Sequence, residues 1–181
     1  MKIITDRLNL RNIHEMDEND ITDIYSNEKV CEYLLHEAWT HENRKEKFQE
    51  ELSKHDLFGK DGLNIIVDLE DKAIGLLTVW HTEMRETLEI GFSFSPEFTG
   101  KGYATESVTA LFDYLFSQFQ IHRIQANCDA RNQASAGLCK RAGMRQEAHF
   151  IKDFWNKGEW TDSLIFAILK EEHMKENKNQ Y

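Results

Sequence analysis

Proline is nearly absent from this 181-residue chain, which has one, and no Gly- or Ser-rich stretch occurs before the last dozen residues. Without such a stretch there is no change of composition at which a linker could lie. With 40% hydrophobic residues, the chain is long enough to bury a substantial core. We therefore expect one continuous domain over residues 1–170, followed by a polar tail over residues 171–181 that has no apolar period and is expected to fray.

Cysteine is also scarce. The three cysteines, Cys31, Cys128 and Cys139, include no CxxC pair, and the opening MKIITDRLNL lacks the apolar core of a signal peptide. A reducing, cytoplasmic location is the expectation. The eight histidines form no HxxxH or HxH pair with a carboxylate at ligand spacing, so we expect no metal site.

Basic residues are outnumbered, with 22 Lys and Arg against 32 Asp and Glu, for a net charge of −10. They are scattered through Glu-rich segments, and an acidic chain repels nucleic-acid phosphate. We expect neither a nucleic-acid nor a membrane partner. The acidic field either attracts cationic small molecules and basic peptides or serves solubility alone.

Apolar spacing predicts the elements, because a period of two indicates strands and a spacing of three or four indicates helices. Predicted strands are 3–13, 63–69, 73–80, 88–94, 122–128, 144–155 and 159–170, and predicted helices are 17–26, 41–58, 103–119 and 132–142. The central strand–helix–strand unit requires a parallel pair, whereas the short hairpin links require antiparallel pairs. The prediction is an α/β domain of the α+β kind, with a mixed sheet.

Two of the nine glycines lie in SPEFTGKGYATES, between a predicted strand and the longest predicted helix. Gly100 and Gly102 flank Lys101, and such a turn brings free N–H groups and a helix N-terminus to an anion. Glycine also occurs in turns for conformational reasons alone, so the turn by itself fits either explanation. It is neither a Walker loop, which ends in Gly-Lys-Ser/Thr, nor a Rossmann turn, which needs a third glycine.

The segment PEFTGKGYATES, preceded by LEIGFSF and followed by HRIQANCDARNQASAGLCKRAGM, resembles the GNAT acyltransferase superfamily. The resemblance runs from TDRLNLR through NKGEWTDSLIF and is greatest to the branch that includes the ribosomal-protein N-terminal acetyltransferases. It implies one domain of about seven strands in a mostly antiparallel, centrally splayed sheet with about four flanking helices. It also implies acetyl-CoA as co-substrate, an amine acceptor and, since relatives often dimerise, a homodimer.

In that family the pyrophosphate turn reads Arg/Gln-x-x-Gly-x-Gly/Ala, which aligns here with Glu97, Gly100 and Gly102. Glu97 departs from the pattern and cannot donate to phosphate, so backbone amides are expected to hold it. The family places the pantetheine arm between two splayed strands, here 88–94 and 122–128. The expected cofactor-binding residues are Phe92, Ser93, Phe94, Phe98, Thr99, Gly100, Lys101, Gly102, Tyr103, Ala104, Asn132 and Ser135.

Acyl transfer to an amine requires a neutral amine, a group that takes its proton and a donor for the departing thiolate. Only an amine with a lysine-like pKa, roughly 10.4, demands a strong base at neutral pH. Glu89 matches a position where many relatives carry that base. The alternative is an outward-facing strand carboxylate, and Glu86 and Glu83 are weaker rivals for the role.

For the proton donor, many relatives place a Tyr seven residues after the helix-starting Asn, and Cys139 stands there. In the ribosomal-protein branch a Ser three residues after that Asn takes this role, which points to Ser135, on the same helical turn as Asn132. Both can also be ordinary helix-capping residues. Cys139 as an acyl-accepting nucleophile is disfavoured, because a lone Cys on a helix is more often small packing.

Two functions follow from the residues and the resemblance. The first is an N-acetyltransferase that moves an acetyl group from acetyl-CoA directly to a protein or peptide N-terminus or to a small amine. The second is a non-catalytic acyl-CoA-binding module, which the missing Tyr and the altered Glu97 motivate. Trp39, Trp155 and Trp160 either line the acceptor groove or pack in the core.

Overall fold

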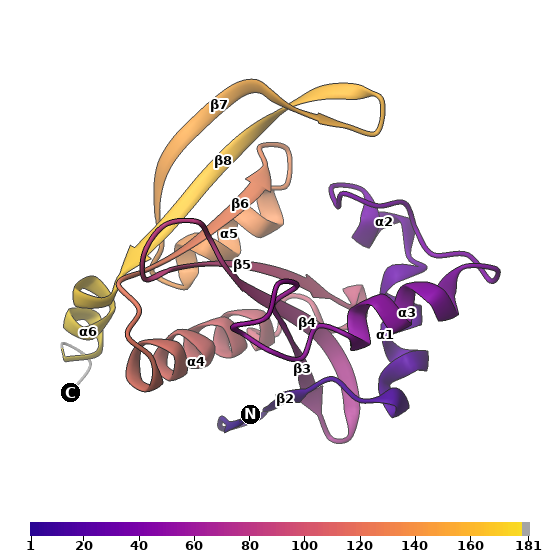
Figure 1. Cartoon of the computed structure of the whole chain (residues 1–181), viewed down its shortest axis with the longest axis horizontal. Coiled ribbons are helices and arrows are strands. Elements are labelled where there is room, and N and C mark those ends of the chain that lie inside the picture. The colour runs from indigo at the N-terminus through magenta and orange to yellow at the C-terminus, as the bar shows by residue number, and fades with distance from the viewer. Residues whose placement is uncertain (179–181) are drawn as a thin grey trace.

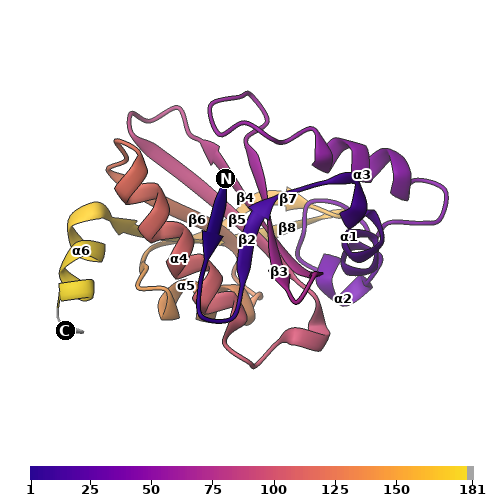
Figure 2. The same cartoon turned by 90° about the horizontal axis from the view of Figure 1, so that it is seen from below.

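The computed structural model describes residues 1–178, which form a single mixed sheet with helices on both faces (Figures 1 and 2). Within these residues the sheet has eight strands in the order β1-β2-β3-β4-β5-β6-β8-β7. In chain order they are β1 Lys2–Ile4, β2 Asn9–Asn12, β3 Leu63–Leu69, β4 Lys72–His81, β5 Thr87–Phe94, β6 Arg123–Asp129, β7 Arg145–Asn156 and β8 Glu159–Leu169.

Six α-helices accompany the sheet in the described part of the chain, with two short 3-10 turns, Glu15–Asp17 and Pro96–Phe98. The helices are α1 Glu18–Tyr25, α2 Glu28–Cys31, α3 Arg44–Leu52, α4 Tyr103–Gln118, α5 Gln133–Arg141 and α6 Lys170–Lys178. Both views place α1, α2 and α3 together on one side of the molecule and α4 and α6 on the other (Figures 1 and 2).

The one parallel pair of the described sheet joins β5 to β6 and is short. It runs from Thr87 opposite Arg123 to Glu89 opposite Gln125, while β5 pairs with β4 as far as Phe94. Residues 90–94 of β5 therefore keep one edge without a strand partner in the described structure. An unpaired strand edge offers backbone N–H and C=O groups to a ligand. The mixed, centrally splayed sheet confirms the predicted fold class.

Alternation along the strands builds a separate core on each face of the sheet. On one face Ile65, Leu77 and Ile90 join a large cluster with α4, whose Val108 and Leu111 are fully buried. On the other face a smaller cluster packs under α1 and α3. Its buried members are Ile13, Ile21, Ile24, Tyr25, Cys31, Trp39, Phe48, Ile66, Ala73 and Leu76.

The predicted element counts need two corrections. The single strand predicted over residues 3–13 is two strands, β1 and β2, because the chain turns back at Thr5, whose backbone N–H donates to the Leu8 carbonyl at 3.0 Å. The predicted four helices omitted α2 and α6. Helix α2 has only four residues, capped by the Asn27 side chain, which accepts from the Lys29 N–H, and is too short to show a period. The helix predicted over 41–58 spans only 44–52.

The expectation that the tail after residue 170 frays is wrong for residues 171–178, which belong to α6. The buried anchor is His173, which is 2% exposed and lies against the Phe112 and Phe116 rings of α4. Its Nε2 atom is 2.7 Å from Asp113 Oδ1. Glu172, beside it, pairs with Arg145. One buried residue in an otherwise polar segment produces no periodic signal. Residues 179–181 lie outside the described structure, and the division of the chain at residue 170 stays a prediction.

We expect His173→Ala to lower the free energy of unfolding by about 2 kcal/mol, since it removes a buried ring and its polar contact together. Urea denaturation followed by circular dichroism measures this. Met174→Ala, on the exposed side of the same helix, is the control and should stay within about 0.5 kcal/mol of the parent. Equal stability of the two variants would show that α6 is not anchored through His173.

Candidate active site

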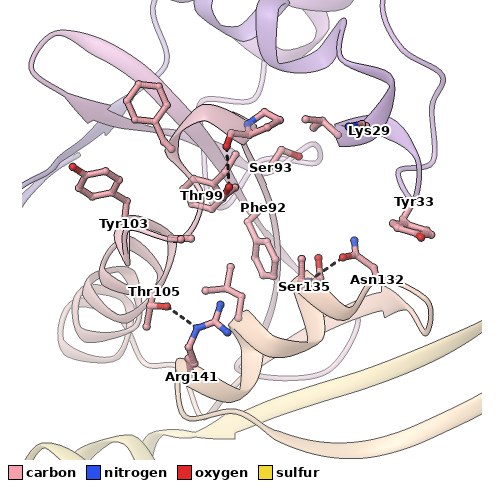
Figure 3. Close-up of a pocket in the computed structure, with 18 of the residues that line it drawn as sticks. Lys29, Tyr33, Phe92, Ser93, Thr99, Tyr103, Thr105, Asn132, Ser135 and Arg141 are labelled. Carbon is pink, nitrogen blue, oxygen red and sulfur yellow. Dashed lines mark hydrogen bonds between the residues drawn. The ribbon is translucent and has the colours of Figure 1, made fainter.

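A cavity of about 750 Å³ opens between the N-terminal end of α4, the free edge of β5, α5 and the segment around α2. Figure 3 shows Phe92 and Ser135 facing it from β5 and α5, with Tyr33 and Tyr103 on opposite sides. Eleven of the twelve residues expected to bind the cofactor line it, namely Phe92, Ser93, Phe94, Phe98, Thr99, Gly100, Gly102, Tyr103, Ala104, Asn132 and Ser135. The structure thus brings together residues from three separate elements.

The twelfth residue, Lys101, belongs to the same turn without lining the cavity. Its ammonium lies 5.2 Å from the centre of the Phe98 ring. Gly100 and Gly102 have φ values of 75° and 84°, a backbone conformation that residues with a Cβ rarely adopt. These two glycines therefore allow the tight entry into α4 that aims its first N–H groups at the cavity.

Arg7, from the loop between β1 and β2, braces the turn from behind. Its guanidinium donates to the Lys101 carbonyl at 2.9 Å, pairs with Glu106 at 2.6 Å and lies 4.5 Å from the Tyr103 ring centre. Burial alone would raise the pKa of Glu106, but hydrogen bonds from Thr5 and Arg7 hold that pKa below its usual value. The first hairpin thus fixes the first turn of α4.

Glu97 does not line the cavity, and 77% of its side chain is exposed. Its carboxylate lies 3.9 Å from the Lys72 ammonium, which is itself 5.4 Å from the Phe98 ring centre. At this position, where the family pattern has Arg or Gln, the chain therefore has a carboxylate that lies outside the cavity. The nearby Lys72 ammonium partly offsets its negative charge.

The other end of the cavity reaches the opposite face of the sheet, at α2. Lys29 and Tyr33 line it there together with Ser93, the β5 residue that points toward that face. Behind Ser93 lies Tyr25 of α1. Burial raises the pKa of the Tyr25 phenol, and the Glu51 charge adds to this effect, while a hydrogen bond with Ser93 opposes it. The phenol therefore stays neutral throughout the physiological range.

Glu89 does not line this cavity. It lies on the sheet face that α1 and α3 cover, opposite Trp80 of β4 and Gln125 of β6. Gln125 Nε2 donates to Glu89 Oε2 at 2.8 Å, so the carboxylate is held where the parallel pair ends. The rivals lie in the turn before β5: Glu83 is exposed, and Glu86 is paired with Arg85.

Asn132 caps α5, because its side-chain oxygen accepts from the Ser135 N–H at 3.0 Å. Both residues also line the cavity, so capping and contact with the cavity coexist. Cys139 is buried outside the cavity lining, and burial raises its pKa to about 12. Burial likewise raises the pKa of Cys128 to about 11. Both thiols are thus protonated at neutral pH, which makes them poor nucleophiles.

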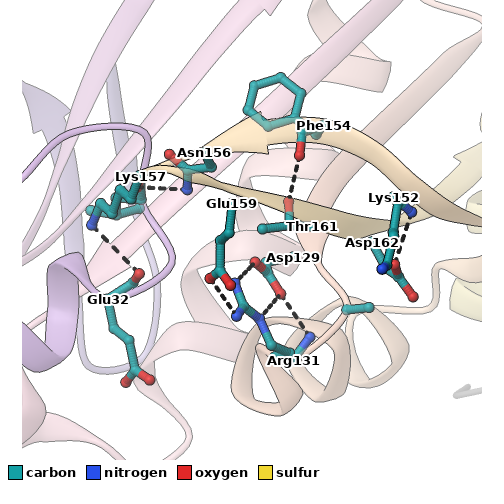
Figure 4. Close-up of polar contacts among 12 residues, drawn as sticks. Glu32, Asp129, Arg131, Lys152, Phe154, Asn156, Lys157, Glu159, Thr161 and Asp162 are labelled. Carbon is teal, nitrogen blue, oxygen red and sulfur yellow. Dashed lines mark hydrogen bonds and ion pairs between the residues drawn. The ribbon is translucent and has the colours of Figure 1, made fainter.

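The β7–β8 hairpin curves over to the α2 side of the molecule (Figure 1). At its tip, Lys157 donates to the Cys31 carbonyl at 2.5 Å and Asn156 donates to the Leu34 carbonyl at 3.3 Å. Figure 4 shows a second contact of the hairpin, which ties it to the end of β6. Arg131 donates to Asp129 at the end of β6 and to Glu159 of β8. The exposed Trp155 and Trp160 pack against each other, with ring centres 5.4 Å apart.

The sequence did not single out several residues that the fold brings to the cavity. Arg141, at the end of α5, lines it and donates to the Thr105 hydroxyl at 3.3 Å. The sequence shows this arginine only as a C-terminal helix charge. Lys29 and Tyr33 come from a segment with no apolar period, and only the fold places them near β5. Arg7 lies in the TDRLNLR start, but its bracing role depends on a contact across about a hundred positions of chain.

In the described part of the chain, no group of three or more His, Cys, Asp and Glu side chains is arranged to hold a metal ion. No helix over residues 1–178 has the length and apolarity that a membrane span requires.

The sequence matches known proteins over most of its length. Residues 7–145 match the model of the Acetyltransferase (GNAT) domain. The chain is 32% identical to the uncharacterized N-acetyltransferase YnaD of Bacillus subtilis, over 95% of this chain and 99% of that protein. It is 26% identical to the [ribosomal protein uS5]-alanine N-acetyltransferase of Escherichia coli, over 93% of this chain and 90% of that protein.

Solved structures share the fold. An acetyltransferase of the GNAT family from Bacillus anthracis superposes with a TM-score of 0.83 at 30% identity, covering 94% of this chain and 99% of the other. The spermidine N-acetyltransferase of Vibrio cholerae, solved with CoA and spermine, has a TM-score of 0.77 at 22% identity, covering 94% and 99%. The chain therefore belongs to the GNAT family of acetyltransferases.

Proposed function

We propose that this protein transfers an acetyl group from acetyl-CoA to a primary amine by direct attack in a ternary complex. The observation that carries the proposal is that one cavity joins the glycine turn, the unpaired edge of β5 and the Asn132–Ser135 turn at the start of α5. Relatives whose names give a substrate act on amines, namely spermidine in one case and a ribosomal-protein alanine in another.

The residues present fit a CoA ester. The two left-handed glycines leave positions 100 and 102 of the turn without side chains, and a Cβ at Gly100 would meet no described atom within 4 Å, apart from its chain neighbours. Arg141 and Lys101 add positive charge beside the first N–H groups of α4, which suits a pyrophosphate. Residues 92–94 of β5 would pair with the pantetheine amides through their open backbone edge.

Acetyl-CoA supplies the activated acetyl thioester. In the proposed reaction the amine nitrogen bonds to the thioester carbon and the C–S bond breaks. Glu89 takes a proton from the nitrogen, directly or through water, and the Ser135 hydroxyl gives a proton to the departing sulfur. Ser135 regains its proton from solvent as Glu89 releases one, so protons balance over a turnover. A backbone N–H on the free edge of β5 would stabilise the carbonyl oxygen.

Arg141→Gln should weaken CoA binding about five- to tenfold, because a cation beside the pyrophosphate contributes a charge-assisted contact. Isothermal titration calorimetry with CoA measures this. The matched control is Lys140→Gln, which removes the same charge from the neighbouring exposed position without touching the cavity. An equal loss of CoA affinity in both variants would mean that Arg141 acts only through the overall charge of the protein and not through contact with the pyrophosphate.

Glu89→Gln and Ser135→Ala should each lower kcat more than about tenfold, with the KM for acetyl-CoA changed less than about threefold, because each group acts on a proton in the transition state. Release of CoA thiol, followed with a thiol reagent, is the measurement. Glu83→Gln is the control for an acidic residue outside the sheet face. If neither variant lowers turnover tenfold on a real substrate, these two roles are wrong.

Cys139→Ala should keep turnover within about threefold of the parent, because a buried, protonated thiol cannot accept the acetyl group. Native mass spectrometry after brief mixing with acetyl-CoA should also show no protein carrying an added acetyl group at this residue. Accumulation of acetyl-Cys139 that an amine then discharges would replace direct transfer by a two-step route.

The non-catalytic acyl-CoA-binding module stays the alternative. A CoA-release screen over N-terminal peptides, polyamines and aminoglycosides separates the two. If acetyl-CoA raises the melting temperature of the protein while no amine in the panel releases thiol, the protein binds the ester without transferring its acetyl group.

A further inference from the structure

The β7–β8 hairpin contains a bulge. Between Phe150 and Phe154 the register of the two strands shifts, so that residues 151–153 of β7 stand against Asp162 of β8 alone. The middle residue of the bulge, Lys152, has a φ of 49°, in the left-handed region that residues with a Cβ rarely adopt. Extra residues on one strand bend that strand and increase its twist. Figure 1 shows the whole hairpin curving in this manner toward the α2 side.

Asp162 holds the bulge through its side chain (Figure 4). Its Oδ1 atom accepts the Lys152 N–H at 2.9 Å, and its Oδ2 atom is 3.0 Å from His149 Nε2. The hydrogen bond from the Lys152 backbone, followed by the contact with His149, holds the pKa of the Asp162 carboxyl below its usual value. The main chain of Asp162 is fixed as well, since its carbonyl accepts the Ala130 N–H at 2.9 Å. The carboxylate therefore replaces the strand partner that Lys152 loses in the bulge.

The curved hairpin reaches two residues that line the cavity. Asn156 donates to the carbonyl of Leu34 at 3.3 Å. Glu159 accepts from Arg131, whose guanidinium lies 5.6 Å from the ring centre of Tyr33. Leu34 and Tyr33 both line the cavity. The hairpin thus contacts one lining residue at its main chain and the other through an arginine.

The α2 segment, residues 27–43, has little regular structure of its own. It contains only the four-residue α2, which is far shorter than a helix that is stable in isolation. On its inner side, the Trp39 N–H and the Cys31 thiol donate to the Tyr25 carbonyl at 2.8 and 3.1 Å. The two lining residues lie between these anchors in the chain, on the side that the hairpin contacts. Their position therefore depends on where the hairpin tip is held.

We propose that Asp162 is a positioning residue: by pinning the bulge it bends the hairpin onto the α2 segment and so fixes the end of the cavity that Tyr33 and Leu34 line. The proposal rests on the acetyl transfer proposed above and adds a residue that lies outside the cavity lining. A donor with its pyrophosphate at the glycine turn and its sulfur near Ser135 would point its acetyl group toward this end. Asp162 would then affect the reacting group more than the affinity for CoA.

Asp162→Ala, combined with a rescue at Lys152, tests the link. The variant loses both side-chain contacts but keeps the carbonyl that Ala130 uses, so it is expected to fold. Hydrogen–deuterium exchange of the α2 segment, followed by mass spectrometry, should become about tenfold faster. In Asp162→Ala/Lys152→Gly it should return to within about threefold of the parent, because glycine adopts the left-handed conformation without help from the carboxylate.

Two further variants separate the hydrogen bond from the charge. Asp162→Asn keeps an oxygen for the Lys152 N–H and should exchange like the parent. Asp153→Ala removes an exposed acid from the bulge itself and is the matched control, with exchange unchanged. If exchange in Asp162→Ala stays within twofold of the parent, or equals that of Asp153→Ala, the proposal is overturned. Faster exchange that glycine at position 152 does not reverse would overturn the role of the bulge.

The second readout is catalytic. With an amine that the parent acetylates, Asp162→Ala should lower kcat about fivefold, while the Kd for CoA stays within about twofold because the glycine turn still holds the donor. The double variant should recover kcat. An unchanged kcat despite a loosened α2 segment, or an equal loss of CoA affinity, would overturn the role of Asp162 in the reaction.

The two readouts also distinguish this proposal from the proposed function. Faster exchange in Asp162→Ala with recovery in the double variant, in a protein that releases no CoA thiol with any amine, upholds the positioning role and refutes acetyl transfer. Turnover of an amine by the parent, with exchange of the α2 segment unchanged in Asp162→Ala, does the opposite.

Discussion

The site depends on a hydrogen-bonded pairing that stops early. β5 and β6 run parallel for only three residue pairs and then separate, whereas β5 remains fixed to β4 as far as Phe94. The separation exposes one backbone edge of β5 in the middle of the described sheet. It also makes room for the cavity and places α4 and α5 on either side of it. Ligand contacts through an open strand edge depend on backbone position more than on side-chain identity.

Charge is distributed unevenly over this acidic chain. The net charge is −10, yet Lys29 and Arg141 line the cavity, and Lys101 and Arg7 support its glycine turn. Basic side chains thus gather around the cavity although the chain as a whole is acidic, which the net charge alone does not reveal.

The fold class and most elements could be predicted from the sequence because local patterns determine them. α4 shows an apolar spacing of three and four residues, and the last hairpin turns across Asn156, Lys157 and Gly158. The Gly100–Gly102 turn can be predicted as an anion site because a strand precedes it and a helix follows it. The residues that were missed, such as Arg7, Lys29 and Arg141, contribute through contacts between distant segments. Helix α6 shows no apolar period for a similar reason, since the contacts of His173 with α4 and of Glu172 with Arg145 hold it.

The same limit applies to the surroundings of Glu89. Trp80, Gly91 and Gln125 stand on three different strands, and only the register of the sheet places them beside Glu89. In the sequence, Gly91 is one residue within a predicted strand. A glycine in a strand interior weakens the strand, and in the structure the Trp80 indole lies against the side of Gly91 where a Cβ would be.

The joint between the β7–β8 hairpin and the α2 segment has an evolutionary consequence. Lys157 and Asn156 reach across to the main-chain carbonyls of Cys31 and Leu34. Every amino acid supplies the same carbonyl, so the segment around α2 can exchange its side chains without losing the joint. A protein built in this way can change the side chains that line the α2 end of the cavity while the hairpin stays docked in one place.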